Sequence, residues 1–221
     1  MLRGAPRGRP RARRAGEGGR VFGEGGRGDG GARVGGPDRR GVHPPRHLHG
    51  QAAREHELIA VAEVLKKTAR HAATLGVSVG VQPVNRFENY LVNTARGADE
   101  LIDRVGEPNV FAHLDTFHMN IEEKGFRDPV LRLGDRLRYV HLSESDRGTP
   151  GSGNIRWDEL FAALSETGFD GRLVLESFVH PDPEMTRLAA LWRDVAEDPE
   201  EPLREGLPFL RAKAKEHGLR L

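Results

Sequence analysis

Four short apolar runs in the chain each finish with a side chain that can bind a metal ion. The runs VGVQ, FAHLD, YVHL and LVLE supply Gln82, Asp115, His141 and Glu176. A single buried carboxylate or imidazole is commonly a core group with satisfied hydrogen bonds, whereas four in successive runs indicate a shared site. Two carboxylates, one imidazole and one amide oxygen suit Mn²⁺, Co²⁺ or Mg²⁺ better than a structural zinc ion. The sequence therefore predicts a divalent metal site.

Such an ion would polarise the carbonyl and an adjacent hydroxyl of a bound sugar, so that a carboxylate can remove the neighbouring carbon-bound proton. Glu88, His118 and Arg147 follow the apolar runs closely, and we expect them on loops over the pocket, where they can bind hydroxyls. The alternatives are a solvated loop histidine, a surface ion pair for Arg147, and a solvated charge or helix cap for Glu88.

The elements that must position these residues alternate between helix and strand periodicity. Apolar residues at steps of three and four predict a first helix from about residue 52, which should stop at Gly76. Predicted strands are 77–81, 110–115, 139–144 and 173–178, and further helices are 95–105, 129–137, 157–167, 185–195 and 203–217. This alternation predicts an α/β fold with a parallel sheet, in which chemistry gathers at the carboxyl ends of the strands.

Residues 1–50 differ in composition from the rest of the chain. They hold 15 Gly, 12 Arg and only four acidic residues, whereas the remainder carries a net charge of about −7. We expect this segment to be disordered, because it offers little apolar surface. It is either an Arg/Gly-rich arm for nucleic acid or, as we favour, a linker or a non-native stretch. Residues 51–221 then form the globular part.

Composition also excludes some classes of site. The chain has no cysteine, so a disulfide framework, a thiolate metal site and a thiol nucleophile are excluded. No run approaches the roughly 20 apolar residues of a membrane span, and the Arg-rich start lacks the apolar core of a secretory signal. We expect a cytoplasmic protein without a membrane partner.

The runs VNRFENYLVNT, HLDTFHMNIEE, YVHLSESDRGTPGSGNIRW and LVLESF resemble the D-tagatose/D-psicose 3-epimerase group of the xylose isomerase-like barrel superfamily. The resemblance covers residues 55–221 and implies about the last four βα units of a TIM barrel. It also implies that Asp115, His141 and Glu176 are metal ligands, that Glu176 is catalytic, and that Glu88, His118 and Arg147 contact a small sugar or sugar phosphate.

Two departures from this family pattern affect the expected activity. Gln82 stands where the family has a glutamate that is both a ligand and a base. An amide oxygen can still coordinate an ion, but it cannot take a proton, and loss of such help costs about 10²–10⁴-fold in rate. The second departure is that only four of eight barrel strands are predicted. Either a second chain, for example in a homo-oligomer, completes the sheet or the chain is poorly stable alone.

The leading hypothesis is thus a metal-dependent, ketose 3-epimerase-like sugar isomerase. The alternative is a non-catalytic derivative that binds a sugar or a partner. A nucleic-acid module is the least favoured, because barrel endonucleases need more histidines than these four units supply.

Overall fold

The computed structural model describes residues 50–179 and 181–219. Its elements are, in chain order, α1 (Glu55–Thr74), β1 (Val79–Val81), α2 (Ala95–Val105), β2 (Val110–Asp115), α3 (Thr116–Glu122), α4 (Arg127–Leu133), the 3₁₀ turn η1 (Gly134–Arg136), β3 (Leu137–Leu142), α5 (Trp157–Glu166), β4 (Arg172–Leu175), α6 (Pro183–Ala189), the π-helical turn η2 (Pro202–Gly206) and α7 (Leu207–Glu216). Apart from Gly50, the predictions for residues 1–50 lie outside the described residues.

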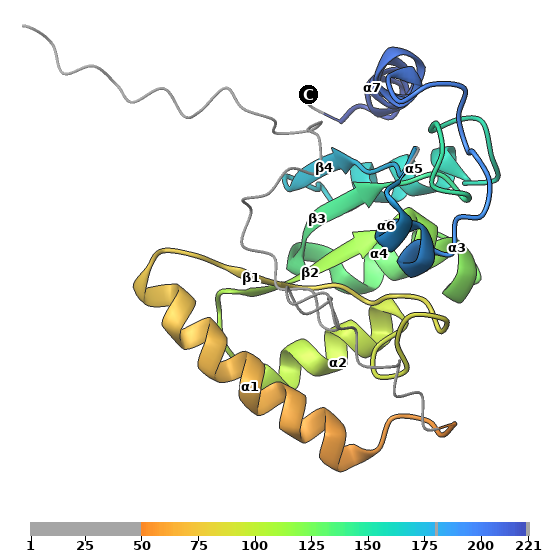
Figure 1. The fold of residues 1–221 in the computed structure, drawn as a ribbon. Coiled ribbons are helices and arrows are strands. Elements are labelled where there is room, and N and C mark those ends of the chain that lie inside the picture. The colour runs from red at the N-terminus through yellow and green to blue at the C-terminus, as the bar shows by residue number, and fades with distance from the viewer. Residues whose placement is uncertain (1–49, 180, 220–221) are drawn as a thin grey trace, which may run out of the picture.

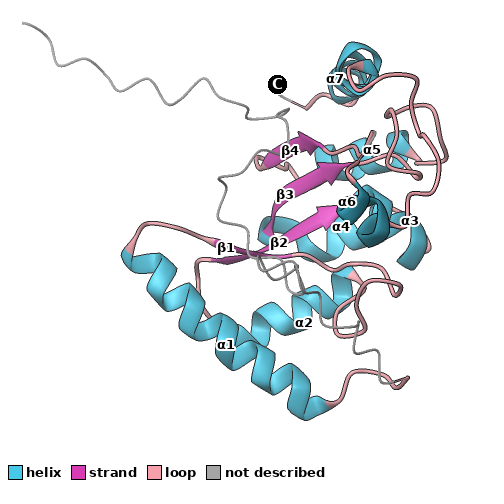
Figure 2. Cartoon of the chain, in the orientation of Figure 1, coloured by secondary structure: helices cyan, strands magenta, loops and turns pink. Residues whose placement is uncertain are grey.

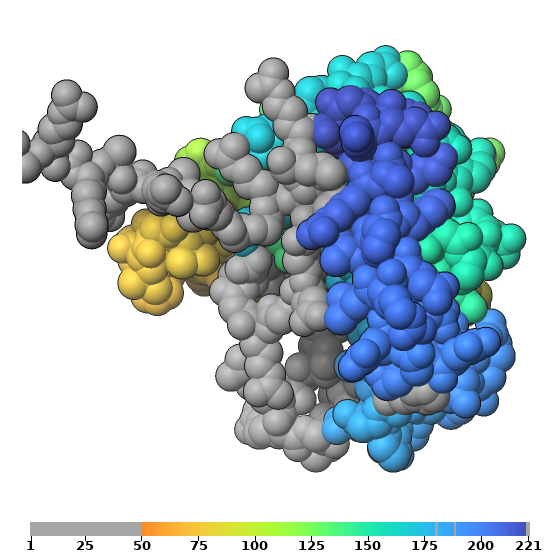
Figure 3. Space-filling view, turned by 90° about the horizontal axis from the view of Figure 1, so that it is seen from above, coloured from red at the N-terminus to blue at the C-terminus, as the bar shows by residue number. Residues whose placement is uncertain are grey.

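The four strands form one parallel sheet in the order β1-β2-β3-β4 (Figure 1). Helices α1, α2, α4 and α5 pack against one another in sequence and form a layer along the sheet (Figure 2). Seen from above, the residues after about 180, drawn in blue, lie along one flank of the molecule (Figure 3). The predicted α/β fold with a partial barrel is confirmed.

Alternation along the strands separates the core from the site. Successive side chains of a strand point to opposite faces of the sheet. Val79, Val81, Ala112, Leu114 and Val140 belong to the buried apolar core. Gln82, Asp115 and His141 each directly follow one of these core residues and therefore face the opposite side of the sheet. Asp115 and His141 are direct register partners across β2 and β3.

Several predicted helices and strands need correction at their ends. The strand expected at 139–144 is β3, which lies two residues earlier, the strand expected at 77–81 begins at Val79, and the helix expected at 203–217 is divided into η2 and α7. The helix expected at 129–137 ends at Leu133, because Gly134 adopts a positive φ of 48° and a 3₁₀ turn follows. The helix expected at 185–195 is α6, which starts two residues earlier behind the N-cap Asp182 and stops before Ala190, whose φ is 52°. The strand expected at 173–178 ends at Leu175, since the amide of Phe178 donates to the Arg147 carbonyl and not to β3.

Candidate metal centre

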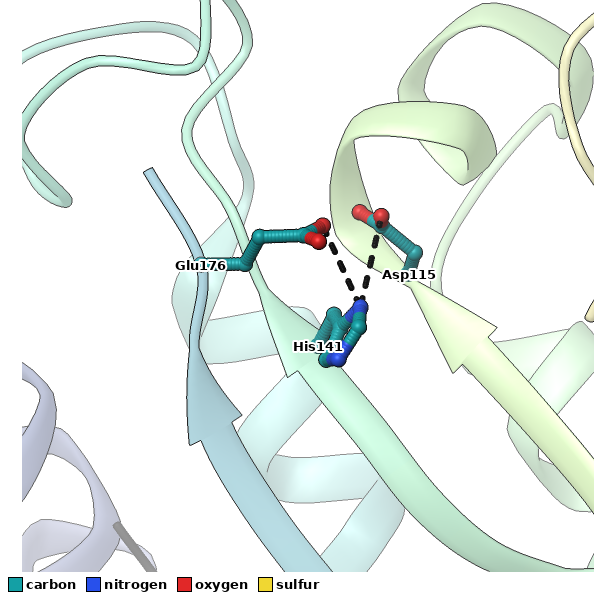
Figure 4. Close-up of side chains that lie close together, drawn as sticks. All are labelled: Asp115, His141 and Glu176. Carbon is teal, nitrogen blue, oxygen red and sulfur yellow. Dashed lines mark ion pairs between the residues drawn. The ribbon is translucent and has the colours of Figure 1, made fainter. Parts of the chain in front are cut away.

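Asp115, His141 and Glu176 converge at the carboxyl end of the sheet (Figure 4). Asp115 is the last residue of β2, His141 is the next-to-last residue of β3, and Glu176 directly follows β4. The Nδ1 atom of His141 lies 3.1 Å from Glu176 Oε2 and 3.9 Å from Asp115 Oδ2. All three residues are less than 9% exposed. The arrangement offers two carboxylates and one imidazole to a single ion.

Local structure fixes which oxygen of Asp115 faces this centre. Its Oδ1 accepts a hydrogen bond from the amide of Phe117 and so caps α3 at its N-terminus. The other oxygen, Oδ2, is left to face His141. Asp115 is fully buried, so the strand end and the helix start together fix its position.

Gln82 follows β1 and lies on the opposite side of Asp115 from Glu176, because the strand order places β1 and β4 at the two edges of the sheet. It is 1% exposed. Its Nε2 is 3.4 Å from Asp115 Oδ2, a weak hydrogen bond. Its Oε1 has no hydrogen-bond partner among the described residues.

The donor set fits a divalent cation. Buried polar atoms normally find a hydrogen-bond partner, yet Gln82 Oε1 and His141 Nδ1 lack one in the described part of the chain. The 3.1 Å approach of His141 Nδ1 to Glu176 does not have the geometry of a hydrogen bond. Unpaired acceptors that converge beside two carboxylates are what a hard cation would satisfy. The four predicted ligands are therefore brought together, although their role as ligands stays a prediction.

Arg147 reaches into the same centre. Its Nη1 donates to Asp115 Oδ2 at 2.9 Å, to Glu176 Oε2 at 2.6 Å and to Ser143 Oγ at 2.9 Å. The guanidinium lies over the ring of Phe117 at 4.2 Å and near that of Phe178 at 4.9 Å. Burial alone would lower the pKa of Arg147, but the charges of Asp115 and Glu176 outweigh it and raise that pKa above its usual value. The alternative of a surface ion pair is wrong.

His118 is also buried, so the alternative of a solvated loop histidine is wrong. It lies in α3 and not on a loop, since Asp115 starts a helix there. Its Nδ1 accepts a hydrogen bond from the amide of Asn85 at 3.1 Å. Burial lowers the pKa of the His118 imidazole below its usual value, against the pull of Asp115. His118 is thus neutral, with its proton on Nε2.

Glu88 lies at the edge of the centre and is only partly buried. Its Oε1 accepts a hydrogen bond from Asn85 Nδ2 at 2.9 Å, and the same nitrogen lies 2.9 Å from His118 Nδ1. Asn85 therefore links two of the predicted substrate contacts. The structure brings Glu88, His118 and Arg147 to one side of the centre, while their contact with a substrate remains a prediction.

Sequence reasoning missed Glu144. This carboxylate is fully buried and accepts hydrogen bonds from the amides of Ser145, Gly151 and Ile155 and from the indole nitrogen of Trp157. It organises the loop between β3 and α5, which carries Arg147. The signal in the sequence was its place as the last residue of the predicted strand 139–144.

A second group of possible ligands, Asp158, Glu216 and His217, lies on the surface. The ammonium of Lys213 is 2.6 Å from Asp158 and 3.2 Å from Glu216. A cation is therefore already supplied by the chain at this position, and the cluster is a surface ion-pair network.

A pocket of about 280 Å³ opens beside Glu176. It is lined by apolar residues, among them Phe178, Pro202 and Leu203, and by the polar residues Glu176 and Ser177. A pocket with apolar walls and one carboxylate can hold a small polar molecule by one face.

Within the described ranges, no helix is both long and apolar enough to cross a bilayer.

Comparisons with known proteins agree with this geometry. The L-ribulose 3-epimerase of Methylomonas sp. (strain DH-1) is 38% identical over 166 residues, which cover 74% of this chain and 58% of that relative. The ketose 3-epimerase of Arthrobacter globiformis is 40% identical over 149 residues, covering 66% of this chain and 52% of the relative. The crystal structure of D-psicose 3-epimerase with D-tagatose from Clostridium cellulolyticum H10 superposes with a TM-score of 0.72 at 32% identity, covering 79% and 62% of the two chains.

The chain thus spans between about half and three-fifths of the length of these relatives. The family model for the xylose isomerase-like TIM barrel matches residues 32–213. The resemblance to the ketose 3-epimerase group is confirmed, and the chain belongs to the xylose isomerase-like TIM barrel family.

Proposed function

We propose that this chain carries the metal-binding and sugar-binding part of a ketose 3-epimerase-like isomerase, which moves a proton at the carbon beside a sugar carbonyl. The observation that carries the proposal is the convergence of Asp115, His141 and Glu176 beside the unpaired Gln82 oxygen. These four residues would hold Mn²⁺, Co²⁺ or Mg²⁺. The bound ion would supply positive charge to the carbonyl and hydroxyl oxygens of the sugar.

Proton transfer and substrate binding are assigned to different residues of the chain. The Glu176 carboxylate, at one edge of the sheet, is the base that removes the proton from carbon and returns it. The guanidinium of Arg147 and the Nε2–H of His118 donate hydrogen bonds to sugar oxygens. The Glu88 carboxylate accepts a hydrogen bond from a sugar hydroxyl. Because the relatives are named for L-ribulose and for ketoses, without a phosphate, we propose an unphosphorylated ketose as substrate.

Gln82 limits what the site can do at its other edge. Inversion at a carbon needs one group to take a proton from one face and another to deliver a proton to the opposite face. An amide can neither accept nor release a proton at neutral pH. Epimerisation should therefore be slow in this chain, and Glu176 alone should exchange the substrate proton with solvent more readily than it inverts the carbon.

The test is incubation with Mn²⁺ or Co²⁺ and a panel of ketoses in D₂O, followed by NMR. We expect deuterium at the carbon beside the carbonyl, with little epimer, in the native protein and more epimer in Gln82→Glu. Asp115→Asn is the matched control and should do neither. Absence of both deuterium and epimer in the native protein and in Gln82→Glu would refute an enzymatic function.

Gln82 also favours a second candidate, a derivative that binds sugar without chemistry. In that case calorimetry should detect sugar binding that is unchanged when the metal is removed, while no deuterium enters the sugar. Sugar binding that disappears with the metal would argue against this candidate.

A further inference from the structure

The Nη1 atom of Arg147 is surrounded by more acceptors than it can serve. It carries two hydrogens, yet Asp115 Oδ2, Glu176 Oε2 and Ser143 Oγ all lie 2.6–2.9 Å away. The two carboxylate oxygens are the same atoms that approach His141 Nδ1 most closely in Figure 4. Arg147 therefore occupies the oxygen atoms that a metal ion would need.

A second contact of the guanidinium is unfavourable. The Nη2 atom of Arg147 lies 3.2 Å from His118 Nε2. His118 Nδ1 accepts from the Asn85 amide, so the proton of the neutral ring is on Nε2. Nη2 and Nε2 are then both donors and face each other without an acceptor between them. An oxygen atom placed between them, such as a sugar hydroxyl, would relieve this contact.

We propose that Arg147 and the divalent ion are competing occupants of Asp115 Oδ2 and Glu176 Oε2, so that binding of the ion drives the guanidinium off these oxygens and makes it available to the sugar. This inference rests on the metal centre of the proposed function. It predicts an order of binding in which the ion comes first and the ketose second.

The anchoring of Arg147 restricts the change to the end of its side chain. Its amide donates to the Glu144 carbonyl, and its own carbonyl accepts from the Phe178 amide and the Ser177 hydroxyl. Its φ of 69° is unusual for a residue with a side chain, which indicates that these contacts hold the backbone in place. The guanidinium also contacts the rings of Phe117 and Phe178, whose centroids lie 4.2 Å and 4.9 Å from its central carbon.

Gln82 makes the competition more important in this chain. The centre has two carboxylates, Asp115 and Glu176, and the charge of Arg147 cancels one of them. A glutamate at position 82 would restore a net charge of two, whereas the amide does not. The guanidinium is therefore a strong competitor for a divalent ion here.

The experiment is calorimetric titration with Mn²⁺ of the native chain, Arg147→Gln and Arg86→Gln. Arg86 is the matched control, because it is an exposed arginine that pairs with another carboxylate, Glu122, at 3.0 Å. We expect at least tenfold tighter Mn²⁺ binding in Arg147→Gln and no change in Arg86→Gln. Equal or weaker binding in Arg147→Gln overturns the inference and leaves the metal centre standing. No Mn²⁺ binding by any of the three refutes the metal centre and the inference with it.

A measurement on the native chain avoids dependence on the folding of the variant. A guanidinium held by two carboxylates rotates slowly about its Cζ–Nε bond, so its two Nη groups give separate ¹⁵N signals. Titration with Mg²⁺, which is diamagnetic, should merge or shift the signals of one buried arginine. Signals that stay unchanged at saturating Mg²⁺ would show that guanidinium and ion do not compete.

Discussion

Replacing Gln82 by glutamate should destabilise the chain without metal and stabilise it with metal. Gln82 Nε2 lies 3.4 Å from Asp115 Oδ2, so the change puts two carboxylates at that separation. Two unit charges 3.4 Å apart repel by about 5 kcal/mol at an effective dielectric constant of about 20. Arg147, which already contacts Asp115, offsets most of this repulsion. We expect a net loss of about 1–3 kcal/mol in the free energy of unfolding.

A divalent ion reverses the sign of the effect, because the third carboxylate becomes a charged ligand in place of a neutral one. If the dissociation constant for Mn²⁺ falls at least tenfold, saturating metal adds about 1.4 kcal/mol or more to the stability gained by the native chain. Calorimetric unfolding with EDTA and with excess Mn²⁺ measures both effects. A loss of about 1 kcal/mol lowers the melting temperature by roughly 2–4 °C in a chain of this size.

Gln82→Met is the control, since it keeps the approximate volume and removes the oxygen. It should show neither the loss without metal nor the gain with metal. The reasoning is refuted if Gln82→Glu gains no more stability from Mn²⁺ than the native chain does, because position 82 would then not face the ion.

Three further changes test the site and the sheet that carries it. Burial depresses the pKa of His118, so the contribution of this residue to stability is complete above the ordinary pKa of 6.5 and is lost as the pH falls through its lower pKa in the folded chain. Urea unfolding between pH 5 and 7 should show this dependence of the unfolding free energy on pH, and His118→Gln should weaken it. Glu144→Gln turns an acceptor of four N–H groups into a partial donor, and we expect chemical denaturation to show a loss of about 2–3 kcal/mol and proteolysis to cut the 145–156 loop faster. Gly171→Ala brings a Cβ against the carbonyl oxygen of Arg138, a backbone atom that cannot move aside, so it should cost more in thermal unfolding than Gly80→Ala, whose clash is with the end of the Phe111 side chain.

The positions of the four candidate ligands could be predicted because they depend only on local periodicity and on parallel pairing. An apolar run that ends in a polar residue places that residue at the sheet's carboxyl edge, and parallel strands bring such edges together. Asp115 and His141 are register partners for this reason. The sequence also held a sign of α3 that the loop prediction overlooked, since an aspartate that ends a strand is a good N-cap for the next helix.

The orientation of the Arg147 side chain could not be predicted, because it depends on contacts between distant parts of the chain. Its carbonyl accepts hydrogen bonds from Ser177 and Phe178, about 30 residues later, and its backbone has a positive φ. Glu144, which shapes the same loop, draws its donors from residues up to 13 positions away. No periodic pattern encodes such a loop. The sequence therefore shows that an arginine follows a strand. Only the folded loop shows that its positive charge lies between the two carboxylates, where it opposes the binding of a cation.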